Sequence, residues 1–242
     1  MKVFFISKKM LIGTTAGLLM MGGCLLLFLL VFSSSGQASK IKQPIYQGNS
    51  GLKAVALNVN VDWGEEYIPE MLKILQSYKT KVTFFVTGQW AEKNPELLKQ
   101  MHAEGHSIQN HGYKHVHFNS LSEQEIREQI RKTQEVINNL LGTDTVLFAS
   151  PYGEINRNIM SVVSSLDYDL IMWSVDTVDW QRPSPDTIVK RVMNKVHNDA
   201  IILMHPTEPT VKALPDMLQK LLDEEYKIVT VQELIATEVQ HD

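Results

Sequence analysis

The sequence predicts an α/β domain whose parallel sheet curls into an incomplete barrel. From Lys53 onward, apolar β-rich runs alternate with amphipathic helical stretches, and such alternation produces parallel strands with right-handed crossovers. Several of the strand-like runs are almost entirely apolar, as expected where both faces of a sheet are covered. Seven such units favour a barrel over an open doubly wound sheet. The first strand is followed by no glycine-rich phosphate loop, which argues against the dinucleotide-binding form of the open sheet.

The individual elements follow from hydrophobic periodicity. The expected strands are Ala54–Val61, Val82–Thr87, Ser107–Asn110, Val146–Ser150, Asp169–Val175, Ala200–Met204 and Lys227–Val231. The expected helices are Ile68–Tyr78, Pro95–Ala103, Ser122–Leu141, Asn156–Ser165, Pro185–Val196 and Val211–Glu224. Ser122 and Glu125 form the capping-box pattern that opens the third of these helices.

The first forty residues are expected to lie outside this domain. Lysines at positions 2, 8 and 9 precede an apolar run from Leu11 to Phe32, which is long enough to cross a bilayer as a helix. Basic residues before such a run keep the N-terminus in the cytoplasm. Cleavage near Ala38 would instead release a secreted form, and Gly23-Cys24 has a faint lipoprotein pattern. The predicted order is a cytoplasmic segment (1–9), a transmembrane anchor or uncleaved signal (10–32), a linker (33–50) and an extracytoplasmic domain (51–238).

Composition narrows the partners of the exported domain. Cys24 is the only cysteine of the chain, so the domain has neither a disulfide nor a thiol nucleophile. The formal net charge is −4 and no basic block occurs, which argues against nucleic acid as a partner. About 190 residues follow the linker, enough for one domain with a sizeable core, and we expect a monomer.

Two histidines, His111 and His115, follow the third predicted strand at a spacing of four. On a helical turn, residues at this spacing share one face. Two neutral imidazoles placed in this way can bind one divalent ion together with a carboxylate. Taken alone, such a pair is more often found on a solvated surface, so the prediction depends on other residues near it.

Other polar residues follow the remaining predicted strands, and the carboxyl ends of parallel strands meet at one rim of the sheet. They are Asn58, Asn60 and Asp62 after the first strand, Ser150-Pro151-Tyr152 after the fourth, Asp176, Asp179 and Trp180 after the fifth, and His205 after the sixth. Each has an ordinary structural explanation as well: Asp62 could cap a helix, Trp180 could belong to the core, and His205 could be buried and neutral. Their shared placement predicts a functional site at this rim.

These motifs resemble those of the polysaccharide deacetylase (NodB-homology) domain of carbohydrate esterase family 4. The closest likeness is to its membrane-anchored, sporulation-type members in bacilli, and it covers residues 53–236. The motifs stand in the family order: Val82-Thr-Phe-Phe-Val-Thr-Gly88, His111-Gly-Tyr-Lys-His115, Ser150-Pro-Tyr152-Gly153, Asp176-Thr-Val-Asp179-Trp180 and Leu203-Met-His205. The resemblance implies a distorted (β/α)7 barrel of NodB-homology type. It also implies a hydrolase that removes acetyl groups from N-acetylhexosamines of peptidoglycan or a related cell-wall glycan.

The resemblance assigns roles by position. His111 and His115 would bind a divalent metal, zinc or cobalt, and His205 would protonate the leaving amine with Asp179 orienting it. The oxyanion and pocket residues would be Tyr152, through its backbone N–H, with Pro151 before it and Trp180 as a wall of the acetyl pocket.

The first motif departs from the family pattern, which is Thr-Phe-Asp-Asp-Gly. Alignment on Val55-Ala-Leu57 puts Asn60 at the position of the catalytic base, and an amide cannot accept a proton from water at useful pH. The metal-ligand position then falls at Val61 or, with extra residues allowed, at Asp62, which could also be a displaced base. Ala149 stands where the family has an arginine. The two losses agree with each other, since a buried arginine without a carboxylate partner is costly.

Three functions remain open on these residues. The first is a metal-dependent deacetylase of cell-wall glycan in which Asp62 takes over part of the first motif. The second is a catalytically impaired, glycan-binding relative in the cell envelope. The third is a different amidase or esterase that uses the same site. Asn60 is the residue that discriminates among them.

Overall fold

The computed structural model describes residues 41–236, which belong to one compact unit that starts at Ile41. The predicted cytoplasmic segment, the anchor and the linker up to residue 40 lie outside the described residues, as do residues 237 and 238 of the predicted domain. Within residues 41–236, no helix combines the length and apolar character needed to cross a membrane.

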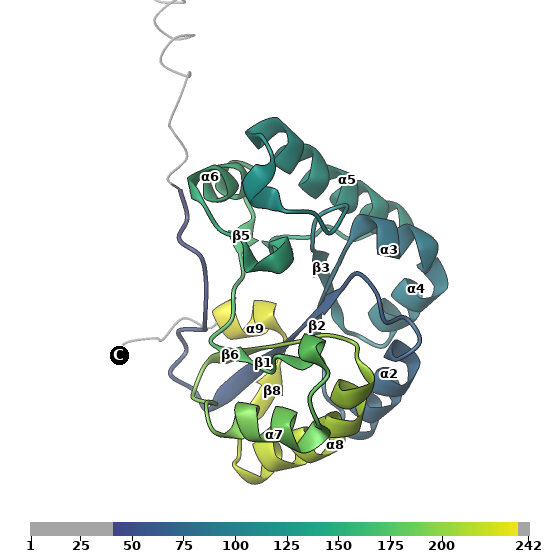
Figure 1. Cartoon of the computed structure of the whole chain (residues 1–242), viewed down its shortest axis with the longest axis vertical. Coiled ribbons are helices and arrows are strands. Elements are labelled where there is room, and N and C mark those ends of the chain that lie inside the picture. Colours follow the sequence, from purple (N-terminus) through teal and green to yellow (C-terminus); the bar gives the residue numbers. More distant parts are fainter. Residues whose placement is uncertain (1–40, 237–242) are drawn as a thin grey trace, which may run out of the picture. The chain divides into compact units, whose positions relative to one another are not determined.

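Eight strands form one parallel sheet that curls, in agreement with the α/β class and consistent with a distorted (β/α)7 barrel (Figure 1). They are β1 (Ala54–Val61), β2 (Thr83–Val86), β3 (Ser107–Asn110), β4 (Leu147–Phe148), β5 (Asp169–Leu170), β6 (Val175–Asp176), β7 (Ala200–Met204) and β8 (Lys227–Val229). Their order in the sheet is β5-β4-β3-β2-β1-β7-β6, and β8 pairs with β1.

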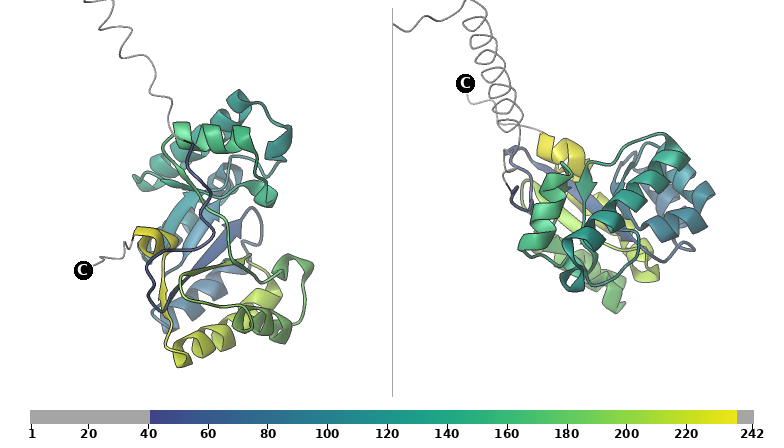
Figure 2. Two further views of the ribbon diagram at one scale, coloured as in Figure 1. Left: turned by 90° about the vertical axis from the view of Figure 1, so that its left-hand side faces the viewer. Right: turned by 90° about the horizontal axis from the view of Figure 1, so that it is seen from above.

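Helices lie around the sheet, and Figure 2 shows this arrangement from two further sides. They are α2 (Ile68–Ser77), α3 (Gly88–Lys93), α4 (Pro95–Ala103), α5 (Glu123–Leu141), α6 (Arg157–Ser165), α7 (Pro185–Met193), α8 (Glu208–Asp223) and α9 (Val231–Ala236), with short 3₁₀ turns η1 (Phe118–Ser120), η2 (Pro151–Gly153) and η3 (Asp179–Gln181). All six predicted helices are present. The capping box at Ser122 and Glu125 is also confirmed.

Two short helices were not predicted. Six residues carry little periodicity, so α3 and α9 are weak signals in the sequence. Thr87 begins α3 because its hydroxyl accepts the N–H of Trp90. Helix α9 replaces the end of the last predicted strand, and its Val231 and Leu234 pack with Ala54 and Ala56 inside the sheet. This helix therefore covers the interior at the end where β1 begins.

Strand β1 separates an apolar outer layer from a mixed interior. Its odd-numbered residues, from Val55 to Val61, belong to the large core beneath the helices. Side chains alternate between the faces of a strand, so its even-numbered residues face inward. These are Ala54 and Ala56 near the start, then Asn58 and Asn60 near the carboxyl end. The interior is thus apolar at one end and polar at the other.

The predicted strand Asp169–Val175 is divided in the structure. Its first two residues form β5, which pairs with β4, whereas Val175 and Asp176 form β6, which pairs with β7. Only residues 171–174 lie between these two strands at opposite ends of the sheet order. A strand that changes partners in this way cannot keep one unbroken ladder, which is why the continuous strand was a wrong prediction.

The segment before β1 also belongs to the fold. Ile45 bridges to Ile171 and Gln47 bridges to Ala200, and the Ile45 N–H donates to the carbonyl of Leu170 at 2.8 Å. This segment therefore lies between the end of β5 and the start of β7. The linker predicted over residues 33–50 therefore ends earlier, because its last residues satisfy backbone groups of the sheet.

We expect Asp199 to be important for stability, since it pins this segment. Its buried carboxylate accepts the Ser50 hydroxyl and the Gly51 N–H (2.7 Å), and its backbone carbonyl accepts the Gly48 N–H (2.8 Å). Asp199→Ala should lower the free energy of unfolding by about 1–3 kcal/mol, because the hydroxyl of the buried Ser50 and the N–H of Gly51 lose their acceptor. Urea denaturation measures the change. Asp199→Asn is the matched control and should cost less, since the amide keeps one acceptor; equal losses would refute this role of the carboxylate.

Candidate functional site

The carboxyl ends of the strands surround a cavity of about 480 Å³. Its lining residues are Asn60, Trp63, His115, Tyr152, Gly153, Trp173, Asp176, Trp180, Leu203 and His205. Five of the predicted site residues are therefore brought together here: Asn60, His115, Tyr152, Trp180 and His205. The other four, Asp62, His111, Pro151 and Asp179, lie next to lining residues rather than in the wall itself.

His205 and Asp179 form a tightly held pair. The His205 Nδ1–H donates to Asp179 Oδ1 at 2.8 Å, and the His205 backbone N–H donates to Oδ2 at 2.7 Å. Oδ2 also accepts the Thr210 hydroxyl at 2.6 Å, and the Asp179 side chain is fully buried. The imidazole is thereby fixed in one tautomer, which leaves Nε2 as the nitrogen that can exchange a proton with a ligand in the cavity.

The loop that carries Asp179 has a strained backbone, which hydrogen bonds hold in place. Val178 and Arg182 flank η3, and both have left-handed backbones, with φ of 51° and 53°. This conformation is costly for a β-branched residue and persists only where the surroundings impose it. The Val178 N–H donates to Asp176 Oδ1 at 2.7 Å, and Arg191 donates to the carbonyl of Thr177 at 2.9 Å. These contacts hold the strained loop in place.

His111 has the protonation state that metal binding requires. Its Nδ1–H donates to the Ala149 carbonyl at 2.8 Å, so Nε2 carries the free lone pair. Burial, assisted by the neighbouring His115, lowers the pKa of His111 to about 3. Burial also lowers the pKa of His115, against an opposing effect of Asp62. The two rings lie 5.2 Å apart between centroids, and both are neutral at physiological pH.

Asp62 lies beside this histidine pair. Its Oδ1 accepts the hydroxyl of Thr87 at 2.8 Å, which ties the end of β1 to the start of α3. Within residues 41–236, no three His, Cys, Asp or Glu side chains gather closely enough to hold a metal ion. The chemistry of the two imidazoles fits a divalent ion, whereas Asp62 as the third ligand stays a prediction.

Asn60 and Ala149 give the interior of the site a neutral character. Asn60 is only 6% exposed, and its Oδ1 has no hydrogen-bond partner among the described residues. Asn58, which precedes it on the same face, is fully buried with neither side-chain polar atom paired within residues 41–236. Ala149 packs with Phe85 and Leu147 in the apolar interior. The position at which the resemblance predicts an arginine is thus occupied by an apolar core residue.

Tyr152 occupies an unusual position at the rim. Its backbone is left-handed, with φ of 58°, and its side chain is 57% exposed. The ring stacks on His117 at 4.1 Å and meets His115 edge-on at 4.4 Å. Pro151 before it is buried. Such strain in an exposed aromatic residue is typical of a functional turn.

Sequence reasoning missed several residues of this site. Trp63 lines the cavity and stacks on His205, with 6.1 Å between ring centroids and 7° between planes. The following Gly64 has φ of 85°, and a Cβ there would lie 2.2 Å from the Pro206 carbonyl oxygen, so the turns after β1 and β7 press together. Trp173 comes from a predicted strand and carried no functional signal, and Leu203 belonged to a recognised motif but was given no role of its own. Thr87 and Thr210, which hold the two carboxylates, give no recognisable signal.

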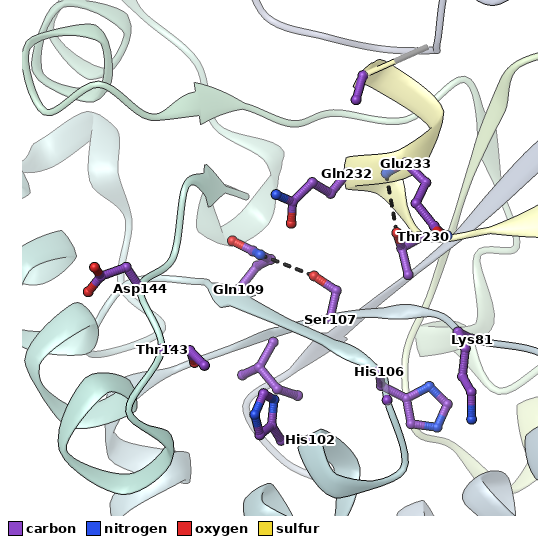
Figure 3. A pocket seen from close by; sticks show the side chains of 13 residues that line it. Lys81, His102, His106, Ser107, Gln109, Thr143, Asp144, Thr230, Gln232 and Glu233 are labelled. Atoms are coloured by element: carbon purple, nitrogen blue, oxygen red, sulfur yellow. Dashed lines mark hydrogen bonds between the residues drawn. The ribbon is translucent and has the colours of Figure 1, made fainter.

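A second hollow, of about 550 Å³, lies at the opposite end of the strands (Figure 3). Its wall includes Lys81, His106 and Ser107, which stand at the starts of β2 and β3, together with Gln232 of α9. His106 has a structural role, because its Nδ1 accepts the Val82 N–H. Burial also lowers its pKa to about 4, so the ring is neutral at physiological pH. Although this hollow is larger, we place the functional site at the other rim, because the strained Tyr152 turn and the buried Asp179–His205 pair lie there.

Several known proteins are similar to this chain over most of the described residues. A family model described as polysaccharide deacetylase matches residues 47–171. The uncharacterized protein YlxY of Bacillus subtilis is 40% identical over 193 residues, which are 80% of this chain and 60% of that protein. A peptidoglycan-N-acetylglucosamine deacetylase of Bacillus cereus is 34% identical over 197 residues, 79% of this chain and 72% of the relative. The chain thus spans less than two thirds of the first relative.

Solved structures are also similar to this chain. A CE4 family pseudoenzyme from Bacillus anthracis aligns with a TM-score of 0.79 and 38% identity, over 81% of this chain and 70% of that one. A mutant of this pseudoenzyme, described as having restored enzymatic activity, aligns with the same TM-score and 37% identity, over 81% and 72% of the two chains.

The histidine pair predicts a metal-binding measurement. The purified full chain should bind one divalent ion, zinc or cobalt, and His111→Ala should weaken binding by more than about tenfold, because even partners of metal ligands contribute 10–100-fold. Metal analysis after dialysis, followed by a competition titration, measures both quantities. His102→Ala removes a histidine at the opposite end of the strands and should change nothing. Equal metal content in the wild type and His111→Ala would refute the site.

Proposed function

We propose that this chain, which belongs to the polysaccharide deacetylase family, binds N-acetylated cell-wall glycan in the rim cavity and hydrolyses its acetyl groups only weakly. The family consists of hydrolases that act on N-acetyl amide bonds. The observation that carries the proposal is that the amide of Asn60 lines the cavity, where the motif alignment predicts the catalytic base. Around it stand the acid histidine, the histidine pair and the strained Tyr152 turn.

The residues that remain can perform part of the reaction. His205, held by Asp179, would protonate the leaving amine through Nε2. The backbone N–H of Tyr152 would donate to the oxygen that becomes negative as the acetyl carbonyl is attacked. A divalent ion on His111 and His115, with Asp62 as the expected third ligand, would polarise that carbonyl and lower the pKa of a bound water.

The missing function is removal of a proton from the attacking water. The amide of Asn60 has no lone pair basic enough for this, and general-base assistance contributes typically ~10²–10⁴-fold to the rate. Ala149 supports the same interpretation, since no arginine charge is present to hold a carboxylate at position 60. The similarity to a CE4 family pseudoenzyme, and to its mutant with restored enzymatic activity, also favours an impaired site.

A second candidate is a fully active deacetylase in which Asp62 has become the base. The observation in its favour is that the Asp62 carboxylate lies close enough to His115 to oppose the lowering of its pKa by burial. Against it stands the position of Asp62 outside the lining of the cavity. An amidase or esterase acting on another acyl group would use the same residues, and no contact in the site favours it.

The partner that we propose is the glycan of the cell envelope. Relatives of the chain include peptidoglycan-N-acetylglucosamine deacetylases, and the apolar run at residues 10–32 would anchor the domain to the outer side of the cell membrane. A secreted form cleaved near Ala38 is the alternative. We propose that the domain acts there as a monomer, during sporulation.

Restoring the carboxylate tests the central part of this proposal. The wild type should release little acetate from N-acetylglucosamine oligomers or peptidoglycan in the presence of zinc or cobalt. Asn60→Asp combined with Ala149→Arg should raise the rate by roughly 10²–10⁴-fold, and Asn60→Asp alone by less, because the new carboxylate lacks its partner. Acetate release in a coupled assay measures the rates.

Asp62 supplies the matching control. If Asn60 limits the rate, Asp62→Asn in the wild type should change metal binding and leave the low rate low. A fully active wild type whose turnover is abolished by Asp62→Asn, with metal content retained, would instead establish the second candidate. A double variant that releases no acetate although it folds and binds metal would contradict the repair argument.

The location has its own test. Protease treatment of intact protoplasts should degrade the domain if it lies outside the cell membrane, because its loops are then accessible. A cytoplasmic protein serves as the protected control. Protection of the domain would refute the proposed topology, and a mature N-terminus near Ser39 would identify the secreted form.

A further inference from the structure

The hollow at the opposite end of the strands has a basic and an acidic side. Lys81 precedes β2, His106 precedes β3, and Asp144 lies in the loop before β4. Figure 3 shows Lys81 and His106 on one side of the hollow and Asp144 on the other. The three strands are neighbours in the order β4-β3-β2, and adjacent strands lie about 4.8 Å apart. The two sides are therefore separated by two strand spacings, about 10 Å.

His106 has a hydrogen-bond donor that no protein group uses. The residue is only 3% exposed, and its Nδ1 accepts the Val82 N–H at 3.2 Å, so the proton of the neutral ring is on Nε2. Phe84 meets the ring edge-on at 5.3 Å and fixes its plane. The Nε2–H has no partner within residues 41–236 and, unlike Oδ1 of Asn60, is not sealed from solvent. Because His106 lines the hollow, this donor points to a bound molecule with an acceptor atom.

Two further donors lie on the same side. The Lys81 ammonium donates to the Glu104 carbonyl and forms no ion pair within residues 41–236. The Lys81 side chain lies along the turn at Gly105, where a Cβ would be 3.4 Å from Lys81 Cε. The Ser107 hydroxyl accepts from Gln109 at 3.1 Å and keeps its own proton to donate. An imidazole, a hydroxyl and an ammonium together suit a carboxylate.

The other side offers an acceptor for a cation. Asp144 Oδ1 accepts the side-chain amides of Gln134 at 2.6 Å and Asn138 at 2.9 Å, whereas Oδ2 accepts no hydrogen bond within residues 41–236. Glu233 also lines the hollow, but its carboxylate accepts the N–H and the hydroxyl of Thr230. Asp144 is therefore the acidic group that suits an amine.

We propose that this hollow binds a short zwitterionic peptide, with its carboxylate at Lys81, His106 and Ser107 and its amine at Asp144. An extended chain covers about 3.3–3.6 Å per residue, so three residues span the separation of about 10 Å. Gln232 stands in the wall between the two sides, and its amide offers the peptide backbone both a donor and an acceptor. The volume of about 550 Å³ is ordinary for a small-molecule site. This binding function is separate from the rim cavity and does not depend on hydrolysis of acetyl groups.

The test uses three ligands that differ only at their ends. Isothermal titration of the purified full chain, in detergent, compares trialanine, N-acetylated trialanine and trialanine amide. The wild type should bind trialanine about three- to tenfold more tightly than either capped peptide, because each cap removes one charged contact at a partly exposed site.

Two variants assign the ends of the peptide. Lys81→Met keeps an unbranched apolar side chain but removes the charge, and should abolish the preference over trialanine amide while keeping the preference over the acetylated peptide. Asp144→Asn keeps an acceptor for Gln134 and Asn138, and should do the reverse. Lys190→Met makes the same change as Lys81→Met at an exposed position of α7 and should leave all three affinities unchanged.

The crossed pattern is what supports the inference. Absence of binding, equal affinity of the wild type for the three peptides, or a preference that neither variant changes would overturn it. If Lys81→Met fails to fold, Asp144→Asn still decides the matter, because only a site with the amine at Asp144 loses the preference over the acetylated peptide alone. Each of these negative outcomes leaves the proposed glycan binding at the other rim intact.

Discussion

Strand β1 is the constraint on which the rest of the domain depends. It pairs with β2 through its second half, with β7 through its middle and with β8 through its first three residues. Three partners fix its register, and a slip of one residue would exchange its two faces. The outer face would then lose Val55, Leu57, Val59 and Val61 from the core under the helices, so Asn60 is held at the rim by the packing of the whole domain.

Around that fixed position, the site has kept its outer parts and lost the charge at its centre. Asp179 accepts three hydrogen bonds and holds His205, and His111 is buried, neutral and oriented by the Ala149 carbonyl. Asn60 and Ala149 carry no charge. Buried charges without partners are expensive, so a neutral pair is a stable arrangement even though it removes the base. Binding residues can thus persist where a catalytic residue is absent, which agrees with the glycan binding and weak hydrolysis that we propose.

Much of this could be predicted from the sequence, because the relevant signals are local. The apolar period of β1, the capping box at Ser122 and the spacing of His111 and His115 each lie within a few residues. What the sequence could not provide depends on contacts between distant segments. The division of one predicted strand into β5 and β6 follows from its two different partners. The packing of Ile45 on the sheet, the stacking of Trp63 on His205 and the hydrogen bond from Thr210 to Asp179 likewise join residues far apart in the chain.

The most direct test of the account is a crystal structure of the wild-type protein soaked with an N-acetylglucosamine oligosaccharide. We predict an intact acetamido group in the rim cavity, with its methyl group against Leu203 and Trp173 and its carbonyl oxygen within hydrogen-bonding distance of the Tyr152 backbone N–H. Asp62 should remain bonded to Thr87, beside the histidine pair. A deacetylated sugar in the cavity, or an oligosaccharide that binds elsewhere on the protein and leaves the cavity empty, would contradict the account.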